Sequence, residues 1–385
     1  MISYFSFPTQ IIFGPGSIEL LAQKVRLLEM KHPMVVTDPG ILRAGLLARV
    51  EEQLKKANLE FSLFSDVAAN PTEDNVTRGT EQYRTSRCDG IVAVGGGSPL
   101  DAGKAIRLKV THDLPLEEYD DLRNGAGRIR PELPHMIAIA TTSGTGSEVS
   151  RSTVITIKQT NRKTVIFSPQ LIPSLAIADP ELTQGMPARV TAGTGMDALT
   201  HNLEAYLSAG YHPMCDAIAL QGIKLVAENL PGAVRHGDDI EYRSNMLMAS
   251  MMGAVAFQKG LGATHSLAHP LSSEAGMHHG TANALMLPYV MEFNLEVAAV
   301  RLRDVAMAMG CDVSGLRQEE AAREAIRAVE ELVEEVGIPR RLRDLPIAEQ
   351  SLPALANKAI QDGCHLLNPR PCSEQDMLEL YRRAF

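Results

Sequence analysis

Several features that commonly point to a function are scarce or missing in this chain of 385 residues. Its five cysteines are scattered and include no C-x-x-C pair. This argues against a structural zinc knuckle and indicates reduced thiols in a cytoplasmic protein. No apolar run approaches the roughly 18–20 residues that a membrane-spanning helix needs. The first ten residues show no basic stretch followed by an apolar one, so we expect no secretory signal and a cytoplasmic location.

Basic residues are also in the minority. The chain has 37 Lys and Arg against 46 Asp and Glu, a formal net charge of −9. This balance argues against broad binding to the phosphate backbone of a nucleic acid, although a local basic pocket stays compatible with it. The content of 45% hydrophobic and 22% charged residues is ordinary for a globular protein. The length favours two domains, or three at most.

Short apolar runs alternate with helical patterns in the first half of the chain. This order predicts a mostly parallel sheet covered by helices, with ligands bound at the carboxyl ends of the strands. The predicted strands are residues 34–37, 59–64, 90–94 and 136–140, and the predicted helices are residues 44–56, 73–86 and 99–108.

Strand signals nearly vanish after about Val190. Long stretches rich in Ala, Leu, Met and Glu follow, such as residues 216–229, 242–257 and 319–336. They predict an all-helical second domain, with the boundary near residues 185–189. We therefore expect an α/β domain over residues 1–187 and an all-α domain over residues 188–385. Helices this large can also support a homodimer or a higher homo-oligomer.

A glycine-rich turn follows the strand at residues 91–94 without a gap. The sequence Gly95-Gly96-Gly97-Ser98-Pro99-Leu100-Asp101 predicts the start of a helix, with Ser98 as the N-cap, Pro99 at the first position and Asp101 in a capping box. Free N–H groups and the positive end of the helix dipole suit a pyrophosphate. A capped turn without a ligand is the alternative, and the pattern is not G-x-G-x-x-G.

Two more features of the first half fit a nucleotide. Asp38 follows a strand, where a carboxylate can bind ribose hydroxyls and repel a 2′-phosphate, although a simple turn residue is an equal alternative. Residues 141–148, TTSGTGSE, place five hydroxyls and two glycines after the strand at residues 136–140. They would form a polar cradle at the carboxyl end of that strand, or else a plain loop.

The second half carries a pattern typical of a metal site. Asp197 and His201 are four residues apart, as are His265 and His269, and a histidine pair stands at residues 278–279. A spacing of four places two side chains on one face of a helix. One carboxylate with several imidazoles suits Fe(II), Zn, Mn or Ni rather than Ca or Mg. Histidines that are merely buried in a core are the alternative.

These motifs together resemble the iron-containing (group III) alcohol dehydrogenase family. That family shares a fold superfamily with glycerol dehydrogenase and dehydroquinate synthase. The resemblance covers essentially the whole chain. It is carried mainly by residues 178–204, with Asp197-Ala198-Leu199, and by residues 262–283, with His279-Gly280-Thr281-Ala282-Asn283. It implies a Rossmann-like dinucleotide-binding domain, an all-helical metal-binding domain of the dehydroquinate synthase-like type, and an active site in the cleft between them.

The resemblance also implies roles for individual residues. The metal ligands would be Asp197, His201, His265 and His279, with His278 outside the set and His269 near both metal and nicotinamide. Lys163 would lie at the cofactor ribose. The other implied cofactor contacts are Asp38, Gly96, Gly97, Ser98, Asp101, Thr141, Thr142 and Thr145.

The implied reaction is an NAD(H)-linked transfer of hydride between a small alcohol or aldehyde and nicotinamide, supported by Fe(2+) or Zn(2+). NAD is expected because relatives that use NADP tend to have glycine at the position of Asp38. We hypothesise that His269 relays a proton through the nicotinamide ribose to solvent. A synthase or lyase of the same superfamily, a metal-dependent hydrolase and a non-catalytic binding protein are the alternatives.

The substrate itself is the least defined part of the prediction. Ser152, Phe257 and Lys259 stand near the expected pocket, and relatives often carry a bulkier residue at the first position and a neutral one at the last. A lysine there, with Arg151, would favour a short aldehyde with an anionic tail. The alternative is that Lys259 is a surface or structural charge.

Overall fold

A computed structural model describes residue 7, residues 10–160 and residues 162–385. The described residues form two compact units. We call them the sheet unit, which holds the described residues from Phe7 to Thr142 and Gly146–Gly185, and the helical unit, which holds Ser143–Thr145 and Met186–Phe385. The three residues Ser143–Thr145 therefore pack with the helical unit although the chain on both sides belongs to the sheet unit.

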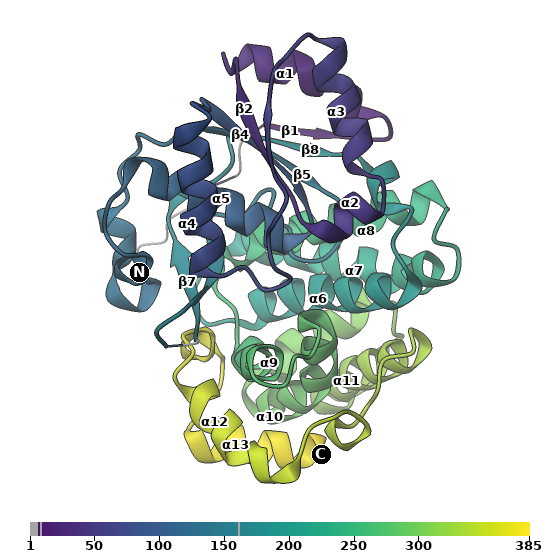
Figure 1. Cartoon of the computed structure of the whole chain (residues 1–385). Coiled ribbons are helices and arrows are strands. Elements are labelled where there is room, and N and C mark those ends of the chain that lie inside the picture. Colours follow the sequence, from purple (N-terminus) through teal and green to yellow (C-terminus); the bar gives the residue numbers. More distant parts are fainter. Residues whose placement is uncertain (1–6, 8–9, 161) are drawn as a thin grey trace. The chain divides into compact units, whose positions relative to one another are not determined.

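The sheet unit is built on six parallel strands in the order β1-β8-β5-β4-β2-β3 (Figure 1). Gly95 at the end of β4 is level with Ala140 at the end of β5, so the glycine turn and the hydroxyl-rich loop leave the sheet side by side. The strands are β1 (Gln10–Phe13), β2 (Pro33–Val36), β3 (Ser62–Phe64), β4 (Gly90–Gly95), β5 (His135–Ala140) and β8 (Leu175–Ala178).

Helices cover both faces of this sheet. Val35, Val92 and Ile137 pack with α1 (Leu21–Leu27) and α3 (Leu47–Lys56) on one face. Their neighbours Met34, Ile91 and Met136 pack on the other face with α4 and α5. Burial on both faces explains why these strands read as continuous apolar runs. The remaining helices of this unit are α2 (Pro39–Arg43), α4 (Glu73–Thr85) and α5 (Gly97–Thr111).

The start of α5 differs from the sequence prediction. The helix begins at Gly97 with Gly96 as the N-cap, and no described side chain caps it. Ser98, predicted as the cap, instead donates its hydroxyl to the Ala69 carbonyl at 2.6 Å. The prediction that Ser98 is the N-cap was wrong. The helix begins two residues earlier than the Ser98-Pro99 pattern suggests, because the glycines allow the chain to turn there.

The helical unit confirms the predicted all-α character of the second half (Figure 1). One core joins α6, α7, α8, α10 and α11, and a second joins α9, α10, α12 and α13. The helices are α6 (Ala188–Leu207), α7 (Pro213–Arg235), α8 (Ile240–Ala256), α9 (Ala263–Ser273), α10 (His279–Ala308), α11 (Gln318–Glu335), α12 (Leu352–Ile360) and α13 (Glu374–Ala384).

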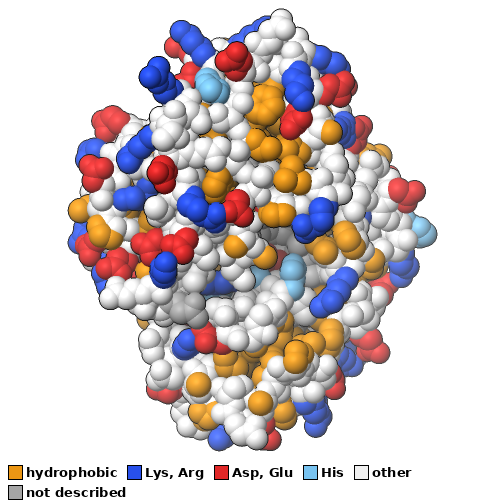
Figure 2. All heavy atoms as spheres, in the orientation of Figure 1, with side chains coloured by type: hydrophobic (Ala, Val, Ile, Leu, Met, Phe, Trp, Pro, Cys, Tyr) orange, Lys and Arg blue, Asp and Glu red, His pale blue; other side chains and the backbone are white. Residues whose placement is uncertain are grey.

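Two observations bear on partners. Within the described part of the chain, none of the helices has the length and apolar character needed to cross a membrane. On the face shown in Figure 2, acidic and basic side chains of the described residues are interspersed rather than gathered into one basic stripe.

Candidate metal centre and cofactor site

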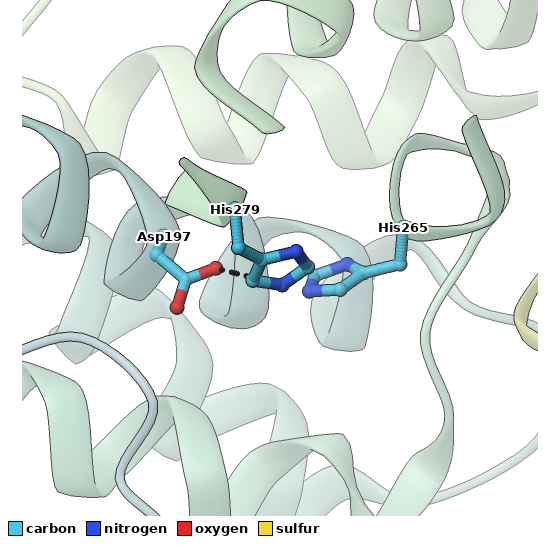
Figure 3. A group of neighbouring side chains, drawn as sticks. All are labelled: Asp197, His265 and His279. Carbon is cyan, nitrogen blue, oxygen red and sulfur yellow. Dashed lines mark ion pairs between the residues drawn. The ribbon is translucent and has the colours of Figure 1, made fainter. Parts of the chain in front are cut away.

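Four predicted ligands lie together in the helical unit. Asp197 and His201 come from α6, His265 from α9, and His279 is the first residue of α10. Asp197, His265 and His279 each offer one ligand atom within 4.8 Å of the others (Figure 3). The Asp197 Oδ1 atom lies 3.5 Å from His279 Nε2 and 4.0 Å from His201 Nε2. The four side chains thus converge on one small volume.

Two glycines allow the helices to approach closely enough for this convergence. A Cβ atom on Gly280 would lie 2.0 Å from the Gly193 carbonyl oxygen, so only glycine lets the start of α10 rest on α6. A Cβ on Gly193 would lie 2.8 Å from His278 Nδ1. His278 therefore packs against α6, whereas His279 faces Asp197.

The donor atoms fit a transition-metal cation. The Asn283 Nδ2 atom lies 2.7 Å from Asp197 Oδ1, 3.3 Å from His265 Nε2 and 3.2 Å from His279 Nε2. One amide nitrogen within 3.3 Å of three possible ligand atoms shows that these atoms surround a common point. Three imidazoles and one carboxylate are donors that Fe(2+) and Zn(2+) accept well.

Glu204 orients His265 within this cluster. Its carboxylate is buried on α6, and it accepts the His265 Nδ1 proton at 2.7 Å. It also accepts the backbone N–H groups of Gly262 at 3.0 Å and Thr264 at 2.6 Å, at the start of α9. Burial opposes ionisation of Glu204, yet the hydrogen bonds from His265 and Thr264 hold its pKa below the usual value. The ionised carboxylate accepts the Nδ1 proton, so Nε2 is the atom of a neutral His265 ring that can bind a metal.

Sequence reasoning assigned no role to Glu204. Its position seven residues after Asp197 places both on one face of α6, and this spacing could have indicated it.

His201 is held by the loop that follows β5. Its Nδ1 atom lies 3.2 Å from the Gly144 carbonyl oxygen. Its ring stacks on His265, with centroids 4.8 Å apart, and meets the edge of Phe257 at 5.2 Å. Burial lowers the pKa of His201, which favours the neutral imidazole that a metal ligand must be. Phe257, a predicted substrate residue, thus packs against one of the proposed metal ligands.

His269 lies beside the cluster rather than in it. Its ring stacks on His279 with centroids 5.3 Å apart and an interplanar angle of 18°. Among the described residues, the group that includes Asp197 does not include His269.

The sheet unit places the glycine turn against the hydroxyl-rich loop. A Cβ on Gly96 would meet Thr142 Oγ1 at 3.1 Å, and Gly95 has a φ of 151°. The Thr141 hydroxyl is buried with no hydrogen-bond partner among the described residues. Gly97 opens α5, so the N–H groups of its first turn stand next to these threonines.

Asp38 acts as a turn residue in the structure. It is the N-cap of α2, and its Oδ1 accepts N–H groups from Gly40 at 2.6 Å and Ile41 at 3.0 Å. Its other oxygen takes no part in these two bonds. A cap and a ribose contact are therefore compatible in one carboxylate.

Asp101 is engaged inside the sheet unit. Its Oδ1 accepts the Ser147 hydroxyl at 2.6 Å, and its Oδ2 accepts the Val154 N–H at 2.9 Å. Burial raises the pKa of Asp101, and the charges of Lys104 and Lys163 oppose that rise. Asp101 thereby ties α5 to the hydroxyl-rich loop and to a hairpin that the sequence analysis did not predict, β6 (Ser152–Ile157) with β7 (Arg162–Phe167).

Ser152 belongs to the same network. Its hydroxyl lies 2.8 Å from the Ser150 hydroxyl, and its carbonyl accepts the Lys104 ammonium at 2.8 Å. The Lys104 ammonium also donates to Ser147 Oγ at 2.9 Å. Thr145, another predicted cofactor contact, packs with the helical unit.

Lys259 does not present its charge to a substrate. Its side chain is 1% exposed, and its ammonium donates to Asp216 Oδ1 at 2.6 Å and to the Tyr206 carbonyl at 2.9 Å. Arg301 pairs with the other Asp216 oxygen at 3.1 Å. The interpretation of Lys259 as an anion-binding pocket residue was wrong, because its ammonium group is paired with Asp216 on α7 and bonded to the Tyr206 carbonyl on α6. The structural-charge alternative fits.

Comparison with known proteins identifies the family. The model described as "Iron-containing alcohol dehydrogenase" matches residues 8–180, and "Fe-containing alcohol dehydrogenase family, C-terminal" matches residues 191–385. The chain belongs to the iron-containing alcohol dehydrogenase family. The predictions of this family, its two-part fold and an oxidoreductase of this kind are therefore confirmed.

Similar proteins cover the chain almost completely. The 1,3-propanediol dehydrogenase of Klebsiella pneumoniae is 40% identical over 381 residues, which is 98% of this chain and 97% of the relative. The NAD-dependent methanol dehydrogenase of Bacillus methanolicus is 34% identical over 385 residues, all of both chains. A crystal structure of a 1,3-propanediol oxidoreductase has a TM-score of 0.96 at 40% identity and 100% coverage of both chains.

Proposed function

We propose that this protein is a metal-dependent, NAD(H)-linked alcohol dehydrogenase that interconverts a small alcohol and its aldehyde. The single observation that carries the proposal is the convergence of Asp197, His265 and His279, with His201 stacked beside them. Dinucleotide binding is assigned to residues 1–187 and metal binding to residues 188–385. Cytoplasmic location and assembly into a homodimer or larger homo-oligomer remain predictions.

Asp197, His201, His265 and His279 would hold the cation, Fe(2+) by the family's description and Zn(2+) by the same donor chemistry. A cation there would act as a Lewis acid toward the oxygen of the alcohol or aldehyde. Glu204 and the Gly144 carbonyl fix the two ring orientations that this binding needs. Two of the four proposed ligand side chains are thus oriented by groups outside the ligand set.

The first turn of α5 would bind the cofactor pyrophosphate through Gly96, Gly97 and Ser98, next to Thr141 and Thr142. NAD bound there would exchange a hydride with the substrate carbon. The second oxygen of Asp38 would accept ribose hydroxyls and repel a 2′-phosphate. Asp101 and Lys104 hold the loop in place, and Lys163 would add a cation near the ribose.

One loop supports the proposal that both sites serve one substrate. Thr141 and Thr142 end in the sheet unit, and the next residues, Ser143–Thr145, pack with the helical unit. The Gly144 carbonyl within that segment holds His201. We therefore propose that the residues proposed for cofactor binding and for metal binding act on one substrate.

The reaction balances with these residues. Oxidation of the alcohol moves a hydride from carbon to the nicotinamide and releases the hydroxyl proton, giving aldehyde, NADH and a proton. His269, stacked on His279, is placed to pass that proton toward solvent. Because Lys259 is paired with Asp216, we favour a short neutral substrate over one with an anionic tail.

Loss of NADH absorbance with a panel of short aldehydes tests the proposal. The protein would be stripped with a chelator and reloaded anaerobically with Fe(2+) or with Zn(2+). Oxidation of NADH that returns with metal supports the proposal. Silence with every metal and aldehyde, although NADH binds, would favour a synthase-like reaction.

A further inference from the structure

A carboxylate outside the proposed ligand set is bonded to His269. The His269 Nδ1 atom lies 2.7 Å from Asp362 Oδ2, and each side chain is only 13% exposed. The two residues are 93 positions apart in the chain. The spacing of the proposed metal ligands in the sequence gives no indication of this contact.

Asp362 is itself firmly held. Its Oδ1 accepts the Ser266 hydroxyl at 2.8 Å and the Cys364 N–H at 2.9 Å. The Ser266 oxygen in turn accepts the His365 N–H at 2.9 Å. The carboxylate is therefore fixed between α9 and the 3-10 turn Cys364–Leu367.

The carboxylate is also kept ionised. Burial opposes its charge, but the interaction with His269 and the hydrogen bonds from Cys364 and Ser266 hold the pKa of Asp362 well below its usual range. An ionised carboxylate can only accept hydrogen bonds. A bond at 2.7 Å then requires a proton on His269 Nδ1. In a neutral ring, Nε2 is left as the proton acceptor.

We propose that Asp362 is a positioning residue that fixes His269 in the Nδ1–H tautomer and in its stacked orientation against His279. This inference rests on the proposed role of His269 in proton transfer. An aspartate that orients a histidine in this way is the arrangement found in hydrolytic triads. Here the oriented ring would serve a dehydrogenase.

The variant Asp362→Asn reverses the tautomer. Two donors, Ser266 Oγ and Cys364 N, reach one carboxylate oxygen, so the amide oxygen of asparagine stays on that side. The amide NH2 group then faces His269 Nδ1 and can bond only to a lone pair. The ring proton moves to Nε2, and the acceptor for proton transfer is lost.

The test compares Asp362→Asn with Asp344→Asn, a control that removes the same charge from an exposed position of the helical unit. Nitrogen chemical shifts of the histidine rings, measured with and without metal, report the tautomer. We expect D362N to move the His269 proton to Nε2. The kcat of D362N should fall about 100-fold, the lower end of the range typical of general acid–base catalysis. KM, NADH affinity and bound metal should match the wild type, and D344N should change none of these.

A double mutant separates positioning from general damage. If Asp362 acts through His269, adding D362N to His269→Gln costs no further activity. An additive loss, an unchanged kcat in D362N, or a His269 ring still protonated on Nδ1 would overturn the inference. Should D362N fail to fold, Asp362→Ala is expected to give mixed tautomers and a lower kcat.

The proposed function can fail separately. If the wild-type protein oxidises no NADH with any metal, the dehydrogenase proposal and the catalytic part of this inference both fall. In that case, the nitrogen chemical shifts alone test whether Asp362 fixes the tautomer of His269.

Discussion

Replacing Glu204 by glutamine should weaken metal binding without touching a ligand. The carboxylate accepts three hydrogen bonds, two on Oε2 from Gly262 and His265 and one on Oε1 from Thr264. Glutamine offers one oxygen and one NH2 group. In either orientation, the NH2 group meets a buried donor or forces the His265 proton onto Nε2, the atom that faces Asp197 and His279.

The structure sets the size of this effect. A buried donor left without an acceptor costs about 1–3 kcal/mol, so the variant should unfold at lower temperature. Loss of a carboxylate that orients a histidine ligand typically costs about 10–100-fold in metal affinity, or about 1.4–2.8 kcal/mol. We expect a fall of this size in the affinity for Fe(2+) and for Zn(2+).

Competition with a chelator of known affinity measures the change in metal binding, and thermal unfolding of the metal-free protein measures the change in stability. Asp304→Asn is the control, because Asp304 accepts the Tyr206 hydroxyl in the same unit. It should lower stability and leave metal affinity unchanged. A folded E204Q variant that binds metal as tightly as the wild type would refute the reasoning.

Three further changes test other parts of the account. Asp38→Gly should raise the ratio of kcat/KM for NADPH over NADH by at least about fivefold, because a repulsion of about 1 kcal/mol or more between Asp38 and the 2′-phosphate disappears. The free energy of unfolding should fall by only a few tenths of a kcal/mol, since glycine is a tolerated N-cap. An unchanged ratio would argue against a role for Asp38 at the ribose. Burial raises the pKa of Glu148 to about 7. The usual pKa of a glutamate is 4.5, so the stability of the wild type should fall as pH rises from this value to about 7. In urea unfolding, Glu148→Gln should be more stable than the wild type by up to about 3 kcal/mol near pH 8 but not near pH 4. Equal differences at both pH values would contradict this. Lys259→Met should destabilise the protein by up to about 3 kcal/mol, since Asp216 loses a buried partner. The ratio of kcat/KM for succinic semialdehyde to that for butyraldehyde should stay unchanged. A loss of activity with the semialdehyde alone would support the interpretation of Lys259 as an anion-binding residue.

The sheet could be predicted where its strands are buried on both faces. β2, β4 and β5 read as continuous apolar runs and were predicted within about one residue. β1 and β8 pair with each other although they are far apart in the sequence, and neither was predicted. β8 is as short, apolar and buried as β2, so its sequence could have indicated a strand. β6 alternates buried and half-buried residues, but its polar and apolar residues do not alternate in the sequence. The five consecutive β-branched residues Thr153–Ile157 are the signal that could have indicated this strand.

The grouping of the proposed metal ligands could be suggested from the sequence because part of their spacing is local, with a spacing of four residues between Asp197 and His201 on α6 and a histidine pair at the start of α10. The residues that orient them were not. His265 lies 61 residues from Glu204, His201 lies 57 from Gly144, and His269 lies 93 from Asp362. Only packing of the helices brings these partners together. The role of Lys259 was predicted wrongly for the same reason, since its partner Asp216 is 43 residues away.

Anomalous X-ray diffraction from crystals loaded with Fe(2+) or Zn(2+) tests the central claim most directly. The helical unit holds a second group that could attract a cation, formed by His269, Asp362 and Cys364. We expect one strong anomalous peak bonded to Asp197, His201, His265 and His279, with His269 and Asp362 still paired. A peak at the second group, or none at the first, would contradict it.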